Sequence, residues 1–295
     1  MRLSKRRMKK LFICLCSIAL LISCEKSSIE NTVDTNEDSP LDPQLAELPS
    51  DLRLLFTEPT QEACESFALI DLGEISLENN TWNAANLNSN SYRQCINTAS
   101  ITNRDLVGWQ WSYPDDAHGI NAYPELIYGK KPWHNRSTTS DIPKQIATIE
   151  RLKVRYKATI SRNQGEYNLA FDNWISSSAN SRPEDIQFEF MIWEDAHEIR
   201  PFGDYRATVA TSQGNYRLYT GEPDWEPAGS NWTYLAFVRE NNRTEGIVDI
   251  DELLDYLVLN DIVPEDSYLS SIEFGTEVGN SKGYAVIEEF SIDLQ

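Results

Sequence analysis

The feature that most limits what this chain can fold into is an alternation of apolar and basic residues between Thr148 and Ile160. The apolar side chains stand at every second position, at Leu152, Val154, Tyr156, Ala158 and Ile160. Basic residues fill the places between them, at Arg151, Lys153, Arg155 and Lys157. Successive side chains of a strand point to opposite faces of its sheet, so the pattern predicts a strand with one dry and one wet face. Such a strand belongs in an outer sheet.

Most of the remaining chain favours short strands separated by turn residues. The predicted strands cover residues 67–76, 92–101, 148–160, 167–174, 188–193, 205–211, 216–219, 233–239 and 283–294. Many short strands without an internal repeat predict an all-β fold, a two-sheet β-sandwich. We expect one folded domain over residues 55–295.

One helix interrupts the strands late in the chain. Apolar residues recur at helical spacing at Ile250, Leu253, Leu254, Leu257 and Val258. Asp249 followed by Glu252 is a variant of the capping box, and Pro264 follows the pattern. We expect this helix to pack on the outer side of the sandwich.

The N-terminal residues have the pattern of an export signal. Six of the 26 Lys and Arg residues lie within Met1–Lys10, and an apolar run over 11–22 follows that is too short to span a bilayer. The run ends in Leu21-Ile22-Ser23-Cys24, which resembles the lipobox of bacterial lipoproteins, where the cysteine is lipidated. We therefore expect residues 1–23 to be a lipoprotein signal peptide and Cys24 to carry a lipid anchor. The alternative is an ordinary secretory signal.

Residues 24–54 are polar and acidic and predict a flexible tether. Glu25 follows the cysteine where an Asp would favour retention in the inner membrane, so we expect the outer membrane or the cell surface. Without residues 1–23 the chain has 20 basic residues against 46 acidic ones. That excess of acids excludes nucleic acid or anionic lipid as a partner bound through charge. We expect a monomer acting on a neutral polymer.

The strand over 186–193 carries the first candidate for chemistry. Phe188, Phe190 and Ile192 share one face, while Glu189, Met191 and Trp193 share the other. An acid beside an aromatic ring suits a sugar-cleaving cleft, which needs a flat platform and a carboxylate. A half-solvated sheet with an exposed glutamate explains the stretch equally well.

A second acid, Glu277, stands between Gly275 and Gly279 near the C-terminus. Glycines on both sides favour a strand end or a bulge that turns a side chain into a cleft. Retaining glycosidases need two carboxylates about 5–5.5 Å apart. With 46 acids in the chain, the pair alone decides little.

Six motifs in the same order resemble glycoside hydrolase family 12, the jelly-roll endo-β-glucanases and xyloglucanases. They span about residues 64–295 and are Cys64 with Cys95, Asn79-Asn80-Thr81-Trp82, Asn121-Ala122-Tyr123-Pro124-Glu125, Tyr167-Asn168-Leu169-Ala170-Phe171-Asp172-Asn173-Trp174, Glu189-Phe190-Met191-Ile192-Trp193, and Gly275-Thr276-Glu277.

The resemblance implies a jelly-roll sandwich and retaining hydrolysis of β-1,4-glucan linkages in xyloglucan, mixed-linkage glucan or cellulose-like chains. It implies Glu189 as the nucleophile, Glu277 as the acid/base and Asp172 as an assisting acid. The residues that it implies for substrate binding are Asn80, Trp82, Tyr123, Met191 and Trp193. For Trp82 and Trp193, packing in the core is the alternative.

Cys64 and Cys95 remain once the three N-terminal cysteines are set aside, and two cysteines in an exported domain most often pair. They also occupy the places of a disulfide found in many members of the family. A metal site is the other use of cysteine, but no histidine has ligand spacing with them. We therefore expect no metal and no cofactor.

The chain departs from the family at Asn83, where the family has glycine, and at 86–91, which looks like an insertion. After Trp193 come Glu194, Asp195, Ala196 and His197, from which we expect added charge near the cleft. Two rival hypotheses remain. A surface glycan-binding lipoprotein without turnover is disfavoured by the three acids, and a family 11 xylanase fits the motifs less well.

Overall fold

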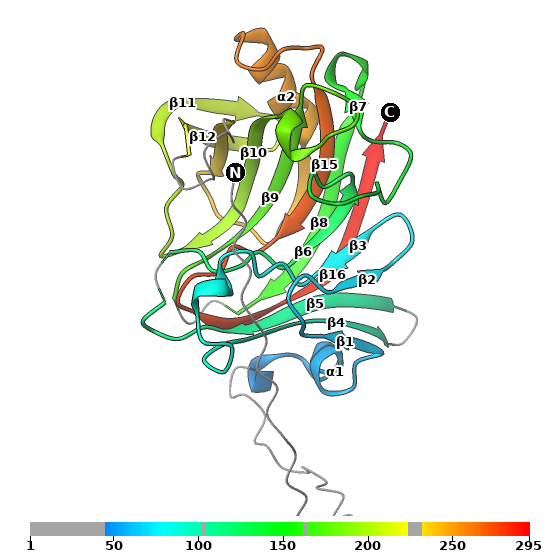
Figure 1. Ribbon diagram of the computed structural model, residues 1–295, viewed down its shortest axis with the longest axis vertical. Helices are drawn as coiled ribbons and strands as arrows, with labels where there is room; N and C mark the ends of the chain where they lie inside the picture. Colours follow the sequence, from blue (N-terminus) through cyan, green and yellow to red (C-terminus); the bar gives the residue numbers. More distant parts are fainter. Residues whose placement is uncertain (1–44, 102–103, 118, 162–164, 224–231) are drawn as a thin grey trace, which may run out of the picture. The chain divides into compact units, whose positions relative to one another are not determined.

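The computed structural model describes residues 45–101, 104–117, 119–161, 165–223 and 232–295. The predicted signal peptide, Cys24 and most of the predicted tether lie outside these ranges. Two β-sheets form the body of the described fold (Figure 1). None of the described helices is both long enough and apolar enough to cross a membrane.

The smaller sheet has six strands, and every neighbouring pair is antiparallel. In spatial order the strands are β1 (Gln61–Ala63), β4 (Arg93–Ile101), β5 (Arg104–Ser112), β16 (Lys282–Leu294), β8 (Leu152–Ile160) and β14 (Glu245–Asp249). The predicted alternation in β8 is confirmed, because Leu152, Val154 and Tyr156 are buried while Arg155 and Lys157 are exposed.

The larger sheet has ten strands and is antiparallel except where β10 and β13 pair in parallel. In spatial order the strands are β11 (Asp204–Thr211), β12 (Gly214–Gly221), β13 (Thr233–Arg239), β10 (Ile186–His197), β9 (Tyr167–Ser176), β15 (Tyr268–Gly275), β6 (Glu125–Gly129), β3 (Ser76–Glu78) and β2 (Leu69–Asp71), with β7 (Lys144–Gln145) paired to β15. The predicted single strand over 67–76 is therefore wrong: it is a hairpin of β2 and β3 that turns at Gly73, whose φ is +92°.

The main core lies between the two sheets. Tyr156 of β8 packs its ring against Phe171 of β9 and Phe274 of β15, at centroid distances of 5.9 and 5.1 Å. The inward residues of β10, Phe190 and Ile192, join the same cluster. These contacts confirm the predicted β-sandwich and leave the other face of the larger sheet free to form a site.

Helix α2 (Ile250–Leu259) forms where the apolar spacing predicts it. Leu253, Leu254 and Leu257 are buried in the main core cluster, and Tyr256 packs against Phe237 of β13. The helix therefore lies on the face of the larger sheet that faces the core, and the expectation that it packs on the outer side of the sandwich is wrong.

The predicted capping box does not form. Asp249 stands at the N-cap without a capping hydrogen bond from its side chain. Its carboxylate instead accepts a hydrogen bond from the Ser212 hydroxyl, and Glu252 accepts one from the Ser212 amide. Both acids therefore fasten the turn between β11 and β12.

The described chain begins with η1 (Leu45–Glu47) and α1 (Ser50–Thr57), which belong to the folded domain. Leu45, Leu48, Leu52 and Leu55 are buried against the outer face of the smaller sheet, where Val286 and Leu106 complete the cluster. The fold therefore starts before the predicted boundary at residue 55, because scattered leucines in a polar stretch form an amphipathic face once they are helical.

Cys64 and Cys95 form a disulfide. Cys95 lies in β4 of the smaller sheet, and Cys64 follows β1. The bond ties the chain that enters the β2–β3 hairpin to the smaller sheet. It therefore fixes the edge of the larger sheet on which Asn80 and Trp82 stand.

Candidate active site

The outward face of β10 presents Glu189, Met191 and Trp193, as the alternation predicts. Across the antiparallel ladder these residues lie opposite Trp174, Asp172 and Ala170 of β9. On the far side of β9, Ser271 lies opposite Trp174 and Gly275 opposite Ala170, which places Glu273 beside Asp172. Three neighbouring strands thus bring acids from distant parts of the chain together on one face.

This face is hollowed into a cleft of about 950 Å³. Its lining is aromatic and acidic, a composition typical of a site that binds sugar rings and does acid–base chemistry. The lining residues used below are Asn80, Trp82, Tyr123, Lys131, Trp133, His134, Asp172, Trp174, Glu189, Trp193, Trp232, Tyr234, Glu273, Glu277 and Glu78.

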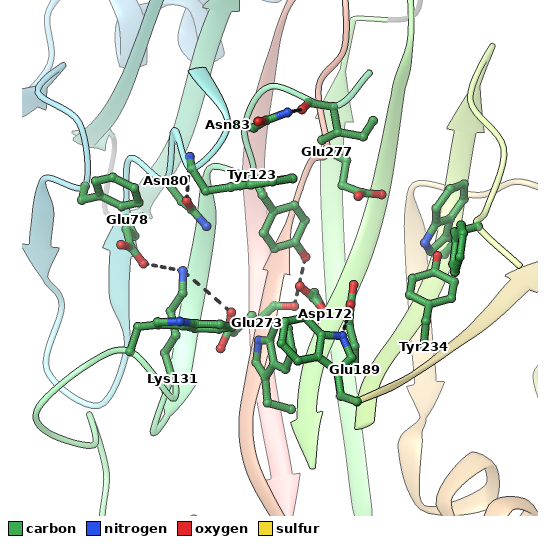
Figure 2. Close-up of a pocket in the computed structure, with 18 of the residues that line it drawn as sticks. Glu78, Asn80, Asn83, Tyr123, Lys131, Asp172, Glu189, Tyr234, Glu273 and Glu277 are labelled. Atoms are coloured by element: carbon green, nitrogen blue, oxygen red, sulfur yellow. Dashed lines mark hydrogen bonds and ion pairs between the residues drawn. The ribbon is translucent and has the colours of Figure 1, made fainter. Parts of the chain in front are cut away.

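Glu189 and Glu277 both line this cleft and point toward each other, and Asp172 lies beside Glu189 (Figure 2). The indole N–H of Trp232 donates a hydrogen bond of 2.9 Å to Oε2 of Glu189. That bond favours the ionised carboxylate and fixes its direction.

Glu277 stands just beyond β15, where the chain continues past Gly275. Its backbone N–H donates to Oδ1 of Asn168 at 2.9 Å, while Nδ2 of Asn168 donates back to Oε2 of Glu277. The next residue, Val278, bridges to Ala122 and Tyr167. A strand extension, rather than a bulge, therefore aims this side chain.

Gly275 is needed for close packing at this strand end. A Cβ atom there would lie 2.4 Å from the carbonyl oxygen of Pro124 and 2.9 Å from the ring of Tyr123. The Tyr123 hydroxyl donates to the Ala170 carbonyl at 2.8 Å, with the Glu273 carbonyl 3.3 Å away. Tyr123 thus ties β9 and β15 together beneath the two opposed acids.

Burial alters the pKa of two of the acids in this cleft. Burial raises the pKa of Glu277 to about 7, and the Asn168 amide offsets part of that rise. Burial, together with the charges of Glu189, Glu125 and Glu277, raises the pKa of Asp172 well above its usual value. Asp172 therefore holds its proton more tightly than an ordinary aspartate does, and Glu277 is poised to give up or take a proton near neutral pH.

Four more charged groups continue the floor of the cleft toward β3. The ammonium of Lys131 lies 2.7 Å from Glu78, within hydrogen-bond distance of Glu125 and 4.0 Å from Glu273, all buried. These carboxylates raise the pKa of Lys131 despite its burial. Burial raises the pKa of Glu125 well above normal and that of Glu273 to about 7. The cluster around Lys131 therefore contains carboxyl groups that bind protons more tightly than ordinary glutamates do.

The predicted binding residues divide into two sets. Asn80, Trp82, Tyr123 and Trp193 line the cleft, and Trp82 is 43% exposed, which excludes the alternative of simple core packing for its ring. Asn80 donates to Glu125 at 3.0 Å. Met191 does not line the cleft: it is buried, and its sulfur accepts a hydrogen bond of 3.4 Å from the Trp193 indole. Met191 therefore lies beneath the Trp193 ring rather than against substrate.

The added charge expected after Trp193 does not reach the cleft through Glu194 or His197. Glu194 continues the inward alternation of β10 and is fully buried, with hydrogen bonds from Tyr156, Tyr216 and Arg243. His197 stacks on Tyr167 and contacts the Gly165 carbonyl.

Asn83 has a negative φ of −109°, so its backbone needs no glycine, and it too lines the cleft.

Several lining residues escaped the sequence analysis, namely Glu78, Lys131, Trp133, His134, Trp174, Trp232, Tyr234 and Glu273. Glu78 and Glu273 each follow a core residue, Leu77 and Ile272, within short strands. That alternation is a signal that could have placed both acids on the face opposite the core.

Among the described residues, the one grouping with metal-ligand chemistry is Glu62 with Cys64 and Cys95. Both cysteines are in the disulfide, so they offer no thiolate to a metal ion. The cleft instead brings together several carboxyl groups, among them Glu189 and Glu277.

A β-sandwich with an aromatic cleft and two opposed carboxyl groups defines a glycoside hydrolase. The sequence profile of glycosyl hydrolase family 12 matches residues 73–295. The chain belongs to this family.

Individual relatives agree with that placement. Endoglucanase S of Pectobacterium parmentieri is 31% identical over 199 residues, covering 64% of this chain and 72% of the relative. Xyloglucan-specific endo-beta-1,4-glucanase 1 of Phytophthora nicotianae is 29% identical over 227 residues, covering 73% and 84%. The family 12 xyloglucanase from Bacillus licheniformis shares the fold with a TM-score of 0.72 at 23% identity, covering 80% of this chain and all of that one.

Proposed function

We propose that this chain is a retaining endo-β-1,4-glucanase, with Glu189 as nucleophile and Glu277 as acid/base. The observation that carries the assignment is the opposition of these two acids across an aromatic cleft, with the pKa of Glu277 raised to about 7. Membership of family 12, whose enzymes retain configuration, supports the reaction type. The names of the endoglucanase and xyloglucanase relatives support β-1,4-glucan as the substrate class.

In the first step the protonated Glu277 gives its proton to the glycosidic oxygen. The C1–O bond breaks, its electron pair leaves with the departing chain, and a carboxylate oxygen of Glu189 bonds to C1. In the second step Glu277 takes a proton from water, the water oxygen bonds to C1, and the bond to Glu189 breaks. Two displacements at C1 restore the original configuration.

The environment of each acid supports this division of roles. The Trp232 N–H stabilises the ionised form of Glu189. The raised pKa of Asp172 favours its neutral form, which adds no second negative charge beside the nucleophile. Asn168 holds Glu277 on the opposite side of the cleft.

Trp82 supplies the exposed surface that binds the glucan main chain in this proposal, and Asn80 and Trp193 form part of the cleft wall, where both are buried. Trp82 offers an exposed ring for stacking against a glucosyl face, and Asn80 offers an amide beside it. A glycan-binding protein without turnover would not need several buried acids gathered in its cleft, with the pKa of Glu277 raised to about 7. The enzyme therefore fits the geometry better than the binding protein.

The test is product analysis of residues 45–295 on xyloglucan, barley-type mixed-linkage glucan, carboxymethylcellulose and xylan. Internal cleavage should lower the viscosity of a neutral glucan before short products accumulate, and NMR should show β-configured products first. Glu189→Gln and Glu277→Gln should each abolish hydrolysis, whereas Asp172→Asn should lower kcat without eliminating it. First-formed α-products, or full activity in either glutamate variant, would overturn the assignment.

We further propose that the protein is lipid-anchored through Cys24 in the cell envelope, at the outer membrane or the cell surface. The lipobox-like Leu21-Ile22-Ser23-Cys24 supports this, since a diacylated N-terminus anchors stably. In a Gram-negative host, Cys24→Ala should move the protein from the membrane fraction to the soluble fraction with the same specific activity. An unchanged membrane fraction would contradict the anchor.

A further inference from the structure

The segment Lys130–His134, which follows β6, forms one side of the cleft and has no part in the reaction proposed above. Trp133 lines the cleft and is 49% exposed, although it belongs to none of the six family motifs. A large exposed aromatic ring inside a binding cleft is typical of a ligand contact.

Two lysines hold this segment from either side. The ammonium of Lys130 donates to the backbone carbonyls of Ser181 at 3.3 Å, Pro132 at 3.5 Å and His134. The ammonium of Lys131 is bound in the floor by Glu78 and Glu125. Trp133 is therefore presented by a preorganised backbone, which lowers the entropy cost of binding a ligand.

Trp133 packs on a row of aromatic rings that leads to Glu189. Its ring meets Trp174 edge to face at 4.8 Å, and Trp174 meets Trp232 in the same way at 5.4 Å. Trp174 lies directly opposite Glu189 in the β9–β10 ladder. The row therefore stands on the Glu189 side of the cleft, away from Glu277.

A glucan main chain that runs from Asn80 and Trp82 to the space between Glu189 and Glu277 would pass beside this row rather than over it. Asn80 and Trp82 stand at the β3 edge, and the chain must pass from them across the strands to the space between Glu189 and Glu277. Asp172 and Glu273 lie along that path, and Trp174 is the next residue on the same face of β9. Residues two apart in a strand are separated by about 7 Å, roughly the width of one sugar.

We propose that Trp133, seated on Trp174, binds a sugar that branches from the main chain, so that the cleft is adapted to branched β-glucan such as xyloglucan. In xyloglucan the xylosyl groups are attached at O6 of the glucosyl units and project sideways from the main chain. Such a group reaches a lateral ring that an unbranched glucan leaves uncovered. This inference rests on the proposed function and deepens it.

The experiment compares kcat/KM on xyloglucan with kcat/KM on mixed-linkage glucan, for the wild type and for Trp133→Ala. The ratio of the two values should fall at least tenfold in the variant. Tyr205→Ala is the matched control, because Tyr205 is 53% exposed but lies on β11 outside the cleft lining, and its ratio should equal that of the wild type. An unchanged ratio in Trp133→Ala overturns the proposal.

An equal loss of kcat/KM on both glucans also overturns the proposal, since that result would mean that Trp133 acts through Trp174 and Trp232 on Glu189.

Calorimetry in the Glu189→Gln background separates binding from turnover, with a xyloglucan heptasaccharide and cellotetraose as the two ligands. Adding Trp133→Ala should weaken binding of the heptasaccharide at least tenfold more than binding of cellotetraose. If the wild type cleaves neither polymer, the proposed function fails, and this binding comparison still decides the role of Trp133.

Discussion

At the scale of single residues, the two opposed acids differ in their neighbours rather than in their chemistry. Glu189 accepts a hydrogen bond from the indole N–H of Trp232. Glu277 accepts one from the side-chain amide of Asn168 and donates one to it through its own backbone N–H. Burial is the larger effect on Glu277 and raises its pKa to about 7. One fold therefore gives two glutamates different environments, which is what the two roles in double displacement require.

The alkaline limb of the pH–rate profile should report Glu277. Because the acid must be protonated for the first step, kcat/KM should fall as the pH rises through about 7. The Asn168 amide stabilises the ionised form, so Asn168→Ala should raise the pKa and move the limb to higher pH. Initial rates on a soluble neutral glucan between pH 4 and 9 measure this. A limb that moves to lower pH would contradict the role given to the amide.

At the scale of elements, strands β3, β6 and β15 together place three acids around one lysine. Glu78, Glu125 and Glu273 come from different strands, and Lys131 comes from the segment after β6. A buried charge without a partner costs several kcal/mol, so the lysine is needed wherever the carboxylates stay ionised.

Lys131→Met should accordingly destabilise the domain. We expect the free energy of unfolding to drop by about 3–5 kcal/mol at pH 7, since the variant leaves buried carboxylates without a cation. The drop should be smaller at pH 5, where Glu273, whose pKa is about 7, is already protonated. Urea unfolding followed by tryptophan fluorescence at both pH values measures the difference.

Arg151→Met is the matched control, because Arg151 pairs with Asp293 at 3.1 Å on the surface, and the two side chains are 45% and 51% exposed. Exposed pairs contribute about 1 kcal/mol or less, so this variant should lose little. Equal losses in the two variants would show that the Lys131 cluster does not stabilise the fold.

The strand pattern could be predicted from the sequence wherever one face is dry and the other wet. In β8 and β10 the alternation fixes which residues point inward, and the prediction for Glu189 follows from it. The β2–β3 hairpin was missed because Gly73 interrupts an apolar run without a strong turn pair. The five-residue β6 was missed because it is buried on both faces and shows no alternation.

The binding residues were harder to predict because they depend on tertiary contacts. Met191 shares a strand face with Glu189, yet Trp193 covers it. Lys131 and Trp133 lie in a segment without periodicity, and only strand pairing brings it beside the cleft. Local sequence determines the face on which a residue lies, whereas depth in the cleft depends on neighbours that are distant in sequence.

At the scale of the whole molecule, the buried acids make the fold sensitive to pH. Burial raises the pKa of Asp172, Glu125, Glu273 and Glu277, so the folded state keeps protons that the unfolded chain releases above about pH 4.5. The unfolded state then binds fewer protons, and stability falls as the pH rises from about 4.5 to 7. The pKa of Glu78, in contrast, is lowered by Lys131 and His134, and its contribution is lost on acidification below its ordinary value.

The melting temperature should therefore be higher near pH 5 than at pH 7.5. Differential scanning calorimetry across this range measures the slope, and Glu273→Gln should flatten it by removing one of the titrating groups. A melting temperature that rises steadily from pH 5 to 7.5 would show that these acids are ionised in the folded protein.

The central claim is that Glu189 forms the covalent bond to the sugar. It is tested most directly in the Glu277→Gln variant with an aryl β-cellobioside whose phenolate leaves without protonation. The glycosyl-enzyme should accumulate because no base activates water, and peptide mass spectrometry should find the added cellobiosyl mass on Glu189. Added azide should then release β-cellobiosyl azide. A label on another acid of the cleft, or α-configured azide product, would contradict the account.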